Sequence, residues 1–136
     1  MISGRPFVIV LAAAVALVEG VFLIGYALYI AVQVARLGIT GPEAVSNPVS
    51  VMMEIVIFAG IGAGLLASAW GLWQLRRWGR APAILGQLLA LIVAVPLAFA
   101  IGSVERSIAI VTIIAAVTAL ICLFLPTTTR ALERAD

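Results

Sequence analysis

The stretch from Phe7 to Ala35 reads FVIVLAAAVALVEGVFLIGYALYIAVQVA, and Glu19 is its single carboxyl group. A helix needs about 20 apolar residues to cross the hydrocarbon core of a bilayer, so this stretch is long enough to span it. A charged carboxylate at mid-depth costs roughly 2.5 to 3.5 kcal/mol on insertion scales. The sequence therefore predicts a transmembrane helix in which Glu19 is protonated, paired or turned toward a polar interior.

The rest of the chain is apolar as well. Of its 136 residues, 65% are hydrophobic and only 10% are charged, which lies far outside the range of soluble globular domains. There is too little polar sequence for a second, soluble domain. The composition predicts an integral membrane protein in which residues 1–136 form a single transmembrane domain. Its expected partner is the lipid bilayer.

Catalytic chemistry has little support in this sequence. Histidine is absent, which removes the commonest general base and the commonest metal ligand, and Cys122 is the only thiol. No base stands next to a serine or cysteine, no metal-ligand spacing occurs, and the few arginines flank apolar spans. We expect a protein that is not an enzyme, has no cofactor or metal, and does not bind nucleic acid.

Three further apolar stretches follow the first, and glycine, proline or basic turns separate them. Short turns place consecutive helices side by side and antiparallel, so we expect an all-α, four-helix transmembrane bundle of up-down topology. The expected spans are residues 7–35, 51–75, 81–101 and 107–125. The remaining segments are the loop 36–50, which includes Gly41, Pro42 and Glu43, the turns 76–80 and 102–106, and a polar tail, 127–136.

The distribution of arginine sets the expected orientation. If the N-terminus is inside, six arginines lie on the inner side and two on the outer side, so the positive-inside rule predicts N-in/C-in topology. The inner six are Arg5, Arg76, Arg77, Arg80, Arg130 and Arg134, and the outer two are Arg36 and Arg106. We interpret Arg76, Arg77, Trp78 and Arg80 as anchors to anionic headgroups at the cytoplasmic face rather than as a specific ligand site. The all-arginine, alanine-rich composition is typical of GC-rich bacterial genomes and indicates a multi-pass protein of a bacterial plasma (inner) membrane.

A polar-tipped stripe on the first helix is the candidate proton or cation site. At about 100° per residue, Glu19, Tyr26, Tyr29 and Gln33 share a face that runs from mid-membrane to the outer surface. Glu54, in the first turn of the second span, lies about 5 Å below the outer boundary and can reach water there. We therefore select Glu19, Tyr26, Gln33 and Glu54 as the candidate residues.

Glu19 needs a partner at its own depth. At about 1.5 Å per residue from the inner boundary, Glu19 lies about 18 Å deep, whereas Gln87 and Ser68 lie about 9 to 10 Å deep and are not level with it. Pro96 cannot donate a hydrogen bond to the carbonyl of Ile92, which is about 16 Å deep, so we expect a protonated Glu19 to donate to that carbonyl. The alternatives are a carboxylate that binds and releases a proton or cation, and a partner in another subunit.

The second span carries small residues at helical spacing. Gly60, Gly64, Ser68 and Gly71 share one face, a pattern that lets another helix approach closely. We interpret this face as a helix-packing surface. It is not a phosphate loop, because it lies inside an apolar span and lacks the following Lys and Ser/Thr.

Two resemblances add to this interpretation. The segment Leu75-Arg76-Arg77-Trp78-Gly79-Arg80-Ala81-Pro82, followed by Gln87-Leu88-Leu89, resembles the central hairpin of uncharacterised four-helix membrane proteins common in actinobacteria, over about residues 71–126. That resemblance implies the fold and brings no assigned activity. Glu19, with Ala12, Ala16 and Gly20 around it, is also similar to the first helix of small multidrug resistance transporters. The second span here has no Tyr and the third no Trp, so the aromatic residues that this family uses around its substrate are missing.

The sequence favours a small, non-enzymatic membrane protein that serves as an accessory or assembly partner. Its small-residue faces would pack against a second copy or against a larger membrane complex. The alternative function is a small proton-coupled transporter that works through Glu19 as a dimer.

Overall fold

The computed structural model describes residues 5–39, 47–99 and 102–134. Gly41, Pro42 and Glu43 of the first loop lie outside the described residues, as do residues 100–101 at the end of the third expected span. The described part of the chain is almost entirely helical and contains no β-strand. The predicted all-α fold class is therefore confirmed.

Four long helices, a 3-10 turn and one short helix make up the described chain. In chain order they are α1 (Phe7–Leu37), α2 (Pro48–Trp73), η1 (Arg77–Gly79), α3 (Arg80–Leu97), α4 (Ser103–Phe124) and α5 (Pro126–Arg134). Helices α1, α2 and α4, and the segment from η1 through α3, are each long and apolar enough to cross a membrane. The chain thus has the helices of a small multi-pass membrane protein, as predicted.

Several helix boundaries differ from the predicted ones by a few residues, and helix α1 ends at Leu37, α2 starts at Pro48 and α3 ends at Leu97. Helix α2 already ends at Trp73, and the chain reverses through η1. Helix α4 begins at Ser103, directly after its N-cap Gly102, so most of the expected turn 102–106 is helical. Residues 126–134, which we expected to be a polar tail, form α5, whose buried Thr128 lies one helical turn before buried Leu132.

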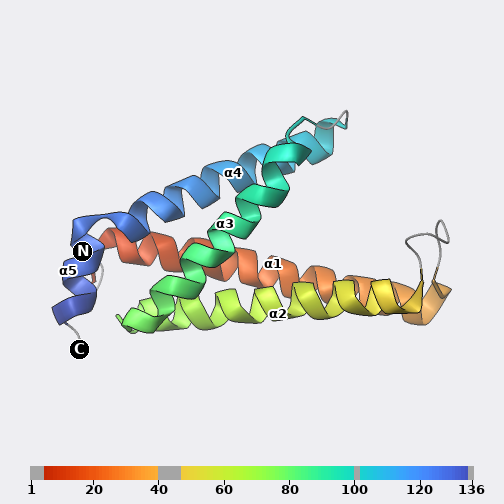
Figure 1. Cartoon of the computed structure of the whole chain (residues 1–136), viewed down its shortest axis with the longest axis horizontal. Helices are drawn as coiled ribbons and strands as arrows, with labels where there is room; N and C mark the ends of the chain where they lie inside the picture. The colour runs from red at the N-terminus through yellow and green to blue at the C-terminus, as the bar shows by residue number, and fades with distance from the viewer. Residues whose placement is uncertain (1–4, 40–46, 100–101, 135–136) are drawn as a thin grey trace.

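The long helices form two antiparallel hairpins, as Figure 1 shows. The first hairpin is α1 with α2, and the second hairpin is α3 with α4. The two lie together at the end that holds α5, which we name the closed end, and they separate toward the opposite end, the open end (Figure 1). The core of the closed end draws on all five α-helices and contains Ile9, Ala12, Ala13, Leu72, Ala83, Cys122, Leu123 and Leu132.

Two glycines let α1 and α2 approach each other closely. A Cβ atom added to Gly20 would lie 3.0 Å from the carbonyl oxygen of Gly62 and 2.9 Å from the side chain of Leu66. A Cβ atom added to Gly62 would lie 3.0 Å from the carbonyl oxygen of Gly20. Backbone therefore meets backbone at this crossing, which is the close packing that small residues permit between membrane helices.

The turn between α2 and α3 folds back against α2. Leu75 adopts the left-handed conformation, with φ of 59°, directly after Gln74, the C-cap of α2. A Cβ atom added to Gly79 would lie 2.9 Å from the amide nitrogen of Leu72 and 3.0 Å from the carbonyl oxygen of Ser68. The chain therefore enters α3 packed against the backbone of α2 between Ser68 and Leu72.

Thr128 compensates for the proline that separates α4 from α5. Pro126 has no N–H group, so it cannot donate to the carbonyl of Cys122, four residues earlier, as a helical residue would. The hydroxyl of Thr128 donates a hydrogen bond to that carbonyl instead, with an O···O distance of 2.5 Å. This bond is buried, and it fixes the direction in which α5 leaves α4.

We expect Thr128→Val to lower the free energy of unfolding by about 1 to 3 kcal/mol, because the buried carbonyl of Cys122 loses its donor while the side-chain volume is kept. Unfolding in mixed micelles, followed by circular dichroism, measures this loss. Thr127 is exposed, and Thr127→Val provides the matched control. Equal stability of the two variants would contradict the role given to the Thr128 hydroxyl.

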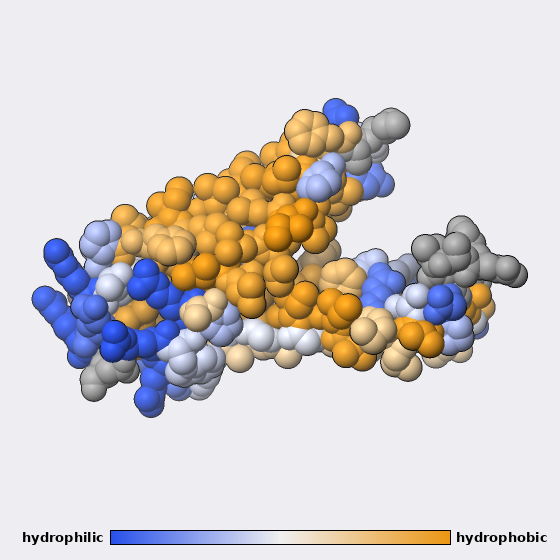
Figure 2. All heavy atoms as spheres, in the orientation of Figure 1, coloured by the Kyte–Doolittle hydropathy of each residue, from blue (hydrophilic) through white to orange (hydrophobic). Residues whose placement is uncertain are grey.

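The surface is apolar along the helices and hydrophilic at the two ends (Figure 2). Large apolar side chains such as Phe22, Ile92 and Val111 are about two-thirds exposed, which suits contact with lipid. Six arginines belong to the segments of the closed end, namely Arg5, Arg76, Arg77, Arg80, Arg130 and Arg134. The start of α1 and the end of α5 also lie there, as expected for an even number of membrane crossings (Figure 1).

Candidate functional site

Glu19 is paired with Gln87, across the two hairpins. The side-chain amide Nε2 of Gln87 in α3 donates a hydrogen bond to Oε2 of Glu19 in α1, and the N···O distance is 2.5 Å. Gln87 is only 1% exposed, and Glu19 is half-buried. The acid in the middle of the first span therefore has a polar partner within the chain.

This pairing corrects the depth estimate made from the sequence. The estimate assumed that α1 and α3 start at the same depth, and it placed Gln87 too far from Glu19. Because the turn folds back on α2, α3 starts beside Ser68, seven residues before Leu75, which moves α3 by about 10 Å along the bundle. The expected partner, the carbonyl of Ile92, is therefore replaced by the amide of Gln87.

Two oxygen atoms of the pair are left without partners. Oε1 of Glu19 and Oε1 of Gln87 are both buried, and neither has a hydrogen-bond partner among the described residues. A buried acceptor without a donor costs about 1 to 3 kcal/mol, so such atoms call for an explanation. A carboxyl oxygen and an amide oxygen can both accept hydrogen bonds, and a carboxyl oxygen can also carry a proton.

Small residues on three helices enclose the pair. Gly20 follows Glu19 directly and packs against Gly62 of α2. Gly86 precedes Gln87 and lies so close to Leu65 that an added Cβ atom would be 2.5 Å from the Leu65 side chain. The glycines bring the backbones of α1 and α2 together and let α3 pack on the Leu65 side chain where the polar side chains meet, and the Oε1 atoms of both side chains are buried there.

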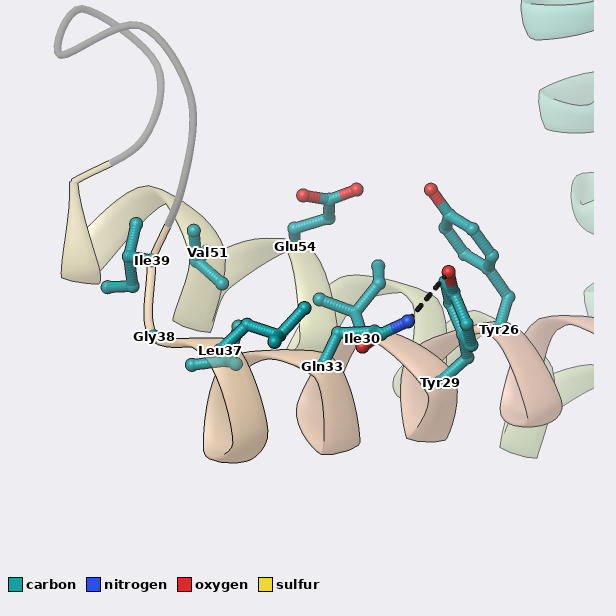
Figure 3. Close-up of a pocket in the computed structure, with 10 residues that line it drawn as sticks. Tyr26, Tyr29, Ile30, Gln33, Leu37, Gly38, Ile39, Val51 and Glu54 are labelled. Atoms are coloured by element: carbon teal, nitrogen blue, oxygen red, sulfur yellow. Dashed lines mark hydrogen bonds between the residues drawn. The ribbon is translucent and has the colours of Figure 1, made fainter.

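The other three candidate residues lie apart from Glu19, in a groove between α1 and α2 at the open end (Figure 3). The groove has a volume of about 550 Å³. Tyr26, Gln33 and Glu54 line it together with Tyr29, and the Gln33 amide donates to the Tyr29 hydroxyl at 2.9 Å. The candidate set is thus divided between a buried pair and an open groove, and Gln87 is the site residue that sequence reasoning missed.

The side chain of Tyr26 is held in this groove by an aromatic neighbour. Its ring meets the ring of Phe58 edge to face, with centroids 5.2 Å apart and an interplanar angle of 87°. The Glu54 carboxylate and the Tyr26 hydroxyl lie on the same side of the groove in Figure 3. The open-end half of the first hairpin therefore presents an acid, an amide and two phenols.

The packing surface predicted on α2 is only partly the one used within the chain. Ser68 and Gly71 are buried within the chain, and Gly71 packs against Trp78. Gly60 and Gly64 are exposed, and a Cβ atom added to either would have no neighbour within 4 Å, so neither glycine packs against another described helix of the chain. Gly62, on the opposite side of the helix, makes the close contact with α1.

The predicted headgroup anchors also divide into two groups. Arg76, Arg77 and Trp78 are exposed at the closed end. The guanidinium of Arg80 instead donates to the hydroxyl of Thr129 at 3.1 Å and lies 5.8 Å from the centroid of the Phe124 ring. Arg80 therefore connects the start of α3 to α5, which leaves less of its charge available to headgroups.

The fold and the polar pair define a class, namely a helical multi-pass membrane protein with an acid–amide pair between two hairpins. Among the described residues, no three His, Cys, Asp or Glu side chains lie close enough together to hold a metal ion. No family model, characterised protein or solved structure matches the chain. The two family resemblances stay predictions, and the function is argued from the geometry.

Proposed function

We propose that this chain is a small, non-enzymatic integral membrane protein that acts as an accessory or assembly subunit in a bacterial plasma membrane. The observation that carries the proposal is the separation of the two hairpins at the open end (Figure 1). It leaves Gln33, Tyr29 and Glu54 of the first hairpin without cover from α3 or α4. Polar groups at this depth need protein or water around them, because lipid chains offer no hydrogen bonds.

The exposed glycines of α2 support the same conclusion. Gly60 and Gly64 are spaced as in a small-xxx-small pattern and lie on the same hairpin as the groove. Such a face permits close approach of a helix from outside the chain. A partner that covers α2 at this position would complete the bundle at its open end.

Photo-crosslinking in native membranes tests this proposal. A photoreactive side chain at exposed Ile57, one turn before Gly60, is expected to give a discrete protein adduct. The control position is exposed Ile121 on α4, near the closed end, where lipid adducts are expected. Lipid adducts alone at both positions would refute a subunit role, and mass spectrometry of a protein adduct would show whether the partner is a second copy or another protein.

A proton-coupled transporter is the second candidate, and the Glu19–Gln87 pair favours it. A carboxyl group held at mid-depth by a partner on the other hairpin is suited to bind and release a proton as the hairpins move. Proton-linked flux in reconstituted vesicles would be abolished in Glu19→Gln if this were the function. A Gln variant that still shows such flux would exclude it.

A further inference from the structure

We propose that Glu19 and Gln87 form a proton-binding site. Glu19 carries a proton on Oε1, and this O–H group donates a hydrogen bond to Oε1 of Gln87. The hydrogen bond links the two hairpins. The proton comes from a hydronium ion of the surrounding water: one O–H bond of the hydronium breaks, one O–H bond forms on the Glu19 carboxylate, and a water molecule is left. This inference goes beyond the proposed subunit role and does not depend on it. It concerns a site whose ligand is the proton.

A carboxylic acid and a primary amide have complementary hydrogen-bonding groups. The two groups can form two hydrogen bonds, from the amide N–H to one carboxyl oxygen and from the acid O–H to the amide oxygen. The first bond is present, from Gln87 Nε2 to Glu19 Oε2. The atoms left over are the two buried Oε1 oxygens, both acceptors without a donor. One added proton provides both with a partner.

Among the described residues, no side chain or backbone group donates a hydrogen bond to Oε1 of Glu19 or to Oε1 of Gln87. The other ionisable groups of the long helices are Tyr26, Tyr29 and Arg36 on α1, Glu54 on α2, Arg80 on α3, and Glu105, Arg106 and Cys122 on α4; Glu105 and Arg106 lie in the first turn of α4, at the open end. Tyr26 packs on Phe58, Glu54 lines the open groove, Arg80 turns to α5 and Cys122 belongs to the core of the closed end. Beside the pair, Gly20 packs against Gly62 and Leu66, and Gly86 packs against Leu65.

The pair lies where the two hairpins begin to separate, so protonation of Glu19 is expected to affect how far apart they lie. Closed-end residues of both hairpins pack in one core, and Gly86 still meets Leu65 beside the pair. The groove farther out is lined only by α1, α2 and the residues that follow α1. Without the proton, the two buried acceptors must be solvated by water, and separating the hairpins is the direct way to admit it. The hairpins are therefore expected to separate further when Glu19 is ionised.

Infrared difference spectroscopy of the purified full chain in lipid tests the bound proton. The wild type is expected to show a carbonyl band of a protonated carboxylic acid that is absent from Glu19→Gln and retained in Glu54→Gln, the control. Gln87→Leu is expected to shift this band, because the hydrogen bond to the carboxyl carbonyl is lost. Wild-type and Glu19→Gln spectra that agree in this region at every pH would overturn the proposal, and so would a band that Gln87→Leu leaves unshifted.

Distance measurements test the link between the hairpins. Spin labels on exposed Val32 of α1 and Val111 of α4 report the opening at the open end, and Cys122 is buried and stays unlabelled. In the wild type, the distance is expected to increase as pH rises. Glu19→Gln keeps two amides that can pair at every pH, so its distance is expected to stay constant. The same pH-dependent change in both proteins would overturn the link, and retained helicity by circular dichroism confirms that each variant is folded.

Discussion

Gly62→Leu is expected to force α1 and α2 apart and to lower the free energy of unfolding by about 3 kcal/mol, at the upper end of the usual cost of overpacking. A Cβ atom at this position would lie 3.0 Å from the carbonyl oxygen of Gly20, 3.0 Å from a side-chain carbon of Ile24 and 3.1 Å from the amide nitrogen of Ile24. Two of these three atoms are backbone atoms of α1, which cannot rotate away as a side chain does. Equilibrium unfolding in mixed micelles measures the loss.

Gly64→Leu is the matched control for this experiment. Gly64 lies on the same helix two residues later, and a Cβ atom there would have no neighbour within 4 Å. The added side chain is therefore expected to leave the stability of the isolated chain nearly unchanged. Equal losses in the two variants would show that the close crossing of α1 and α2 does not determine stability.

Gly79→Leu is expected to have an effect of similar size, about 3 kcal/mol, and to disrupt the Glu19–Gln87 pair from a distance. Its Cβ atom would lie 2.9 Å from the amide nitrogen of Leu72 and 3.0 Å from the carbonyl oxygen of Ser68, which are backbone atoms of α2. The start of α3 must then move away from α2, and Gln87 moves with it. Both the stability and the infrared band of the Glu19 carboxyl group are expected to change.

Arg76→Leu provides the control for the turn. Arg76 is exposed in the same turn, and its side chain lies outside the close contact between Gly79 and α2. This change is expected to leave the infrared band of Glu19 unaltered. A Gly79→Leu variant with a wild-type band would show that the position of α3 does not depend on this contact.

The helices of this protein follow from local sequence. Apolar runs longer than about 20 residues predict membrane-spanning helices whatever surrounds them, because the bilayer requires every backbone group to be paired within the segment. Pro48 and Pro126 sit at helix starts, where proline is tolerated, and the Asn47 side chain caps α2 through the amide of Ser50. The α5 helix was missed because it is short, and only its contact with the core reveals why Thr128 and Leu132 are spaced one turn apart.

The position of one helix relative to another was harder to predict. Gly60, Gly62 and Gly64 lie within five residues of each other, yet of the three only Gly62 meets another described helix of the chain. A run of alternating glycines places small residues on two faces of a helix, so the pattern alone does not select the packed face. The selection depends on Gly20, which presents a matching glycine on α1.

Sequence alone determined that this is a four-span, all-α membrane protein with an acid near the middle of its first span, because hydropathy and helix length are properties of each segment. The tertiary structure decided which residue pairs with that acid. The contact of Gly79 with the backbone of α2 sets where α3 begins, and a shift of about two helical turns brings Gln87 to Glu19. This shift depends on backbone atoms of Gly79 and α2 that come into contact across a turn. It cannot be predicted from the side-chain pattern of either helix.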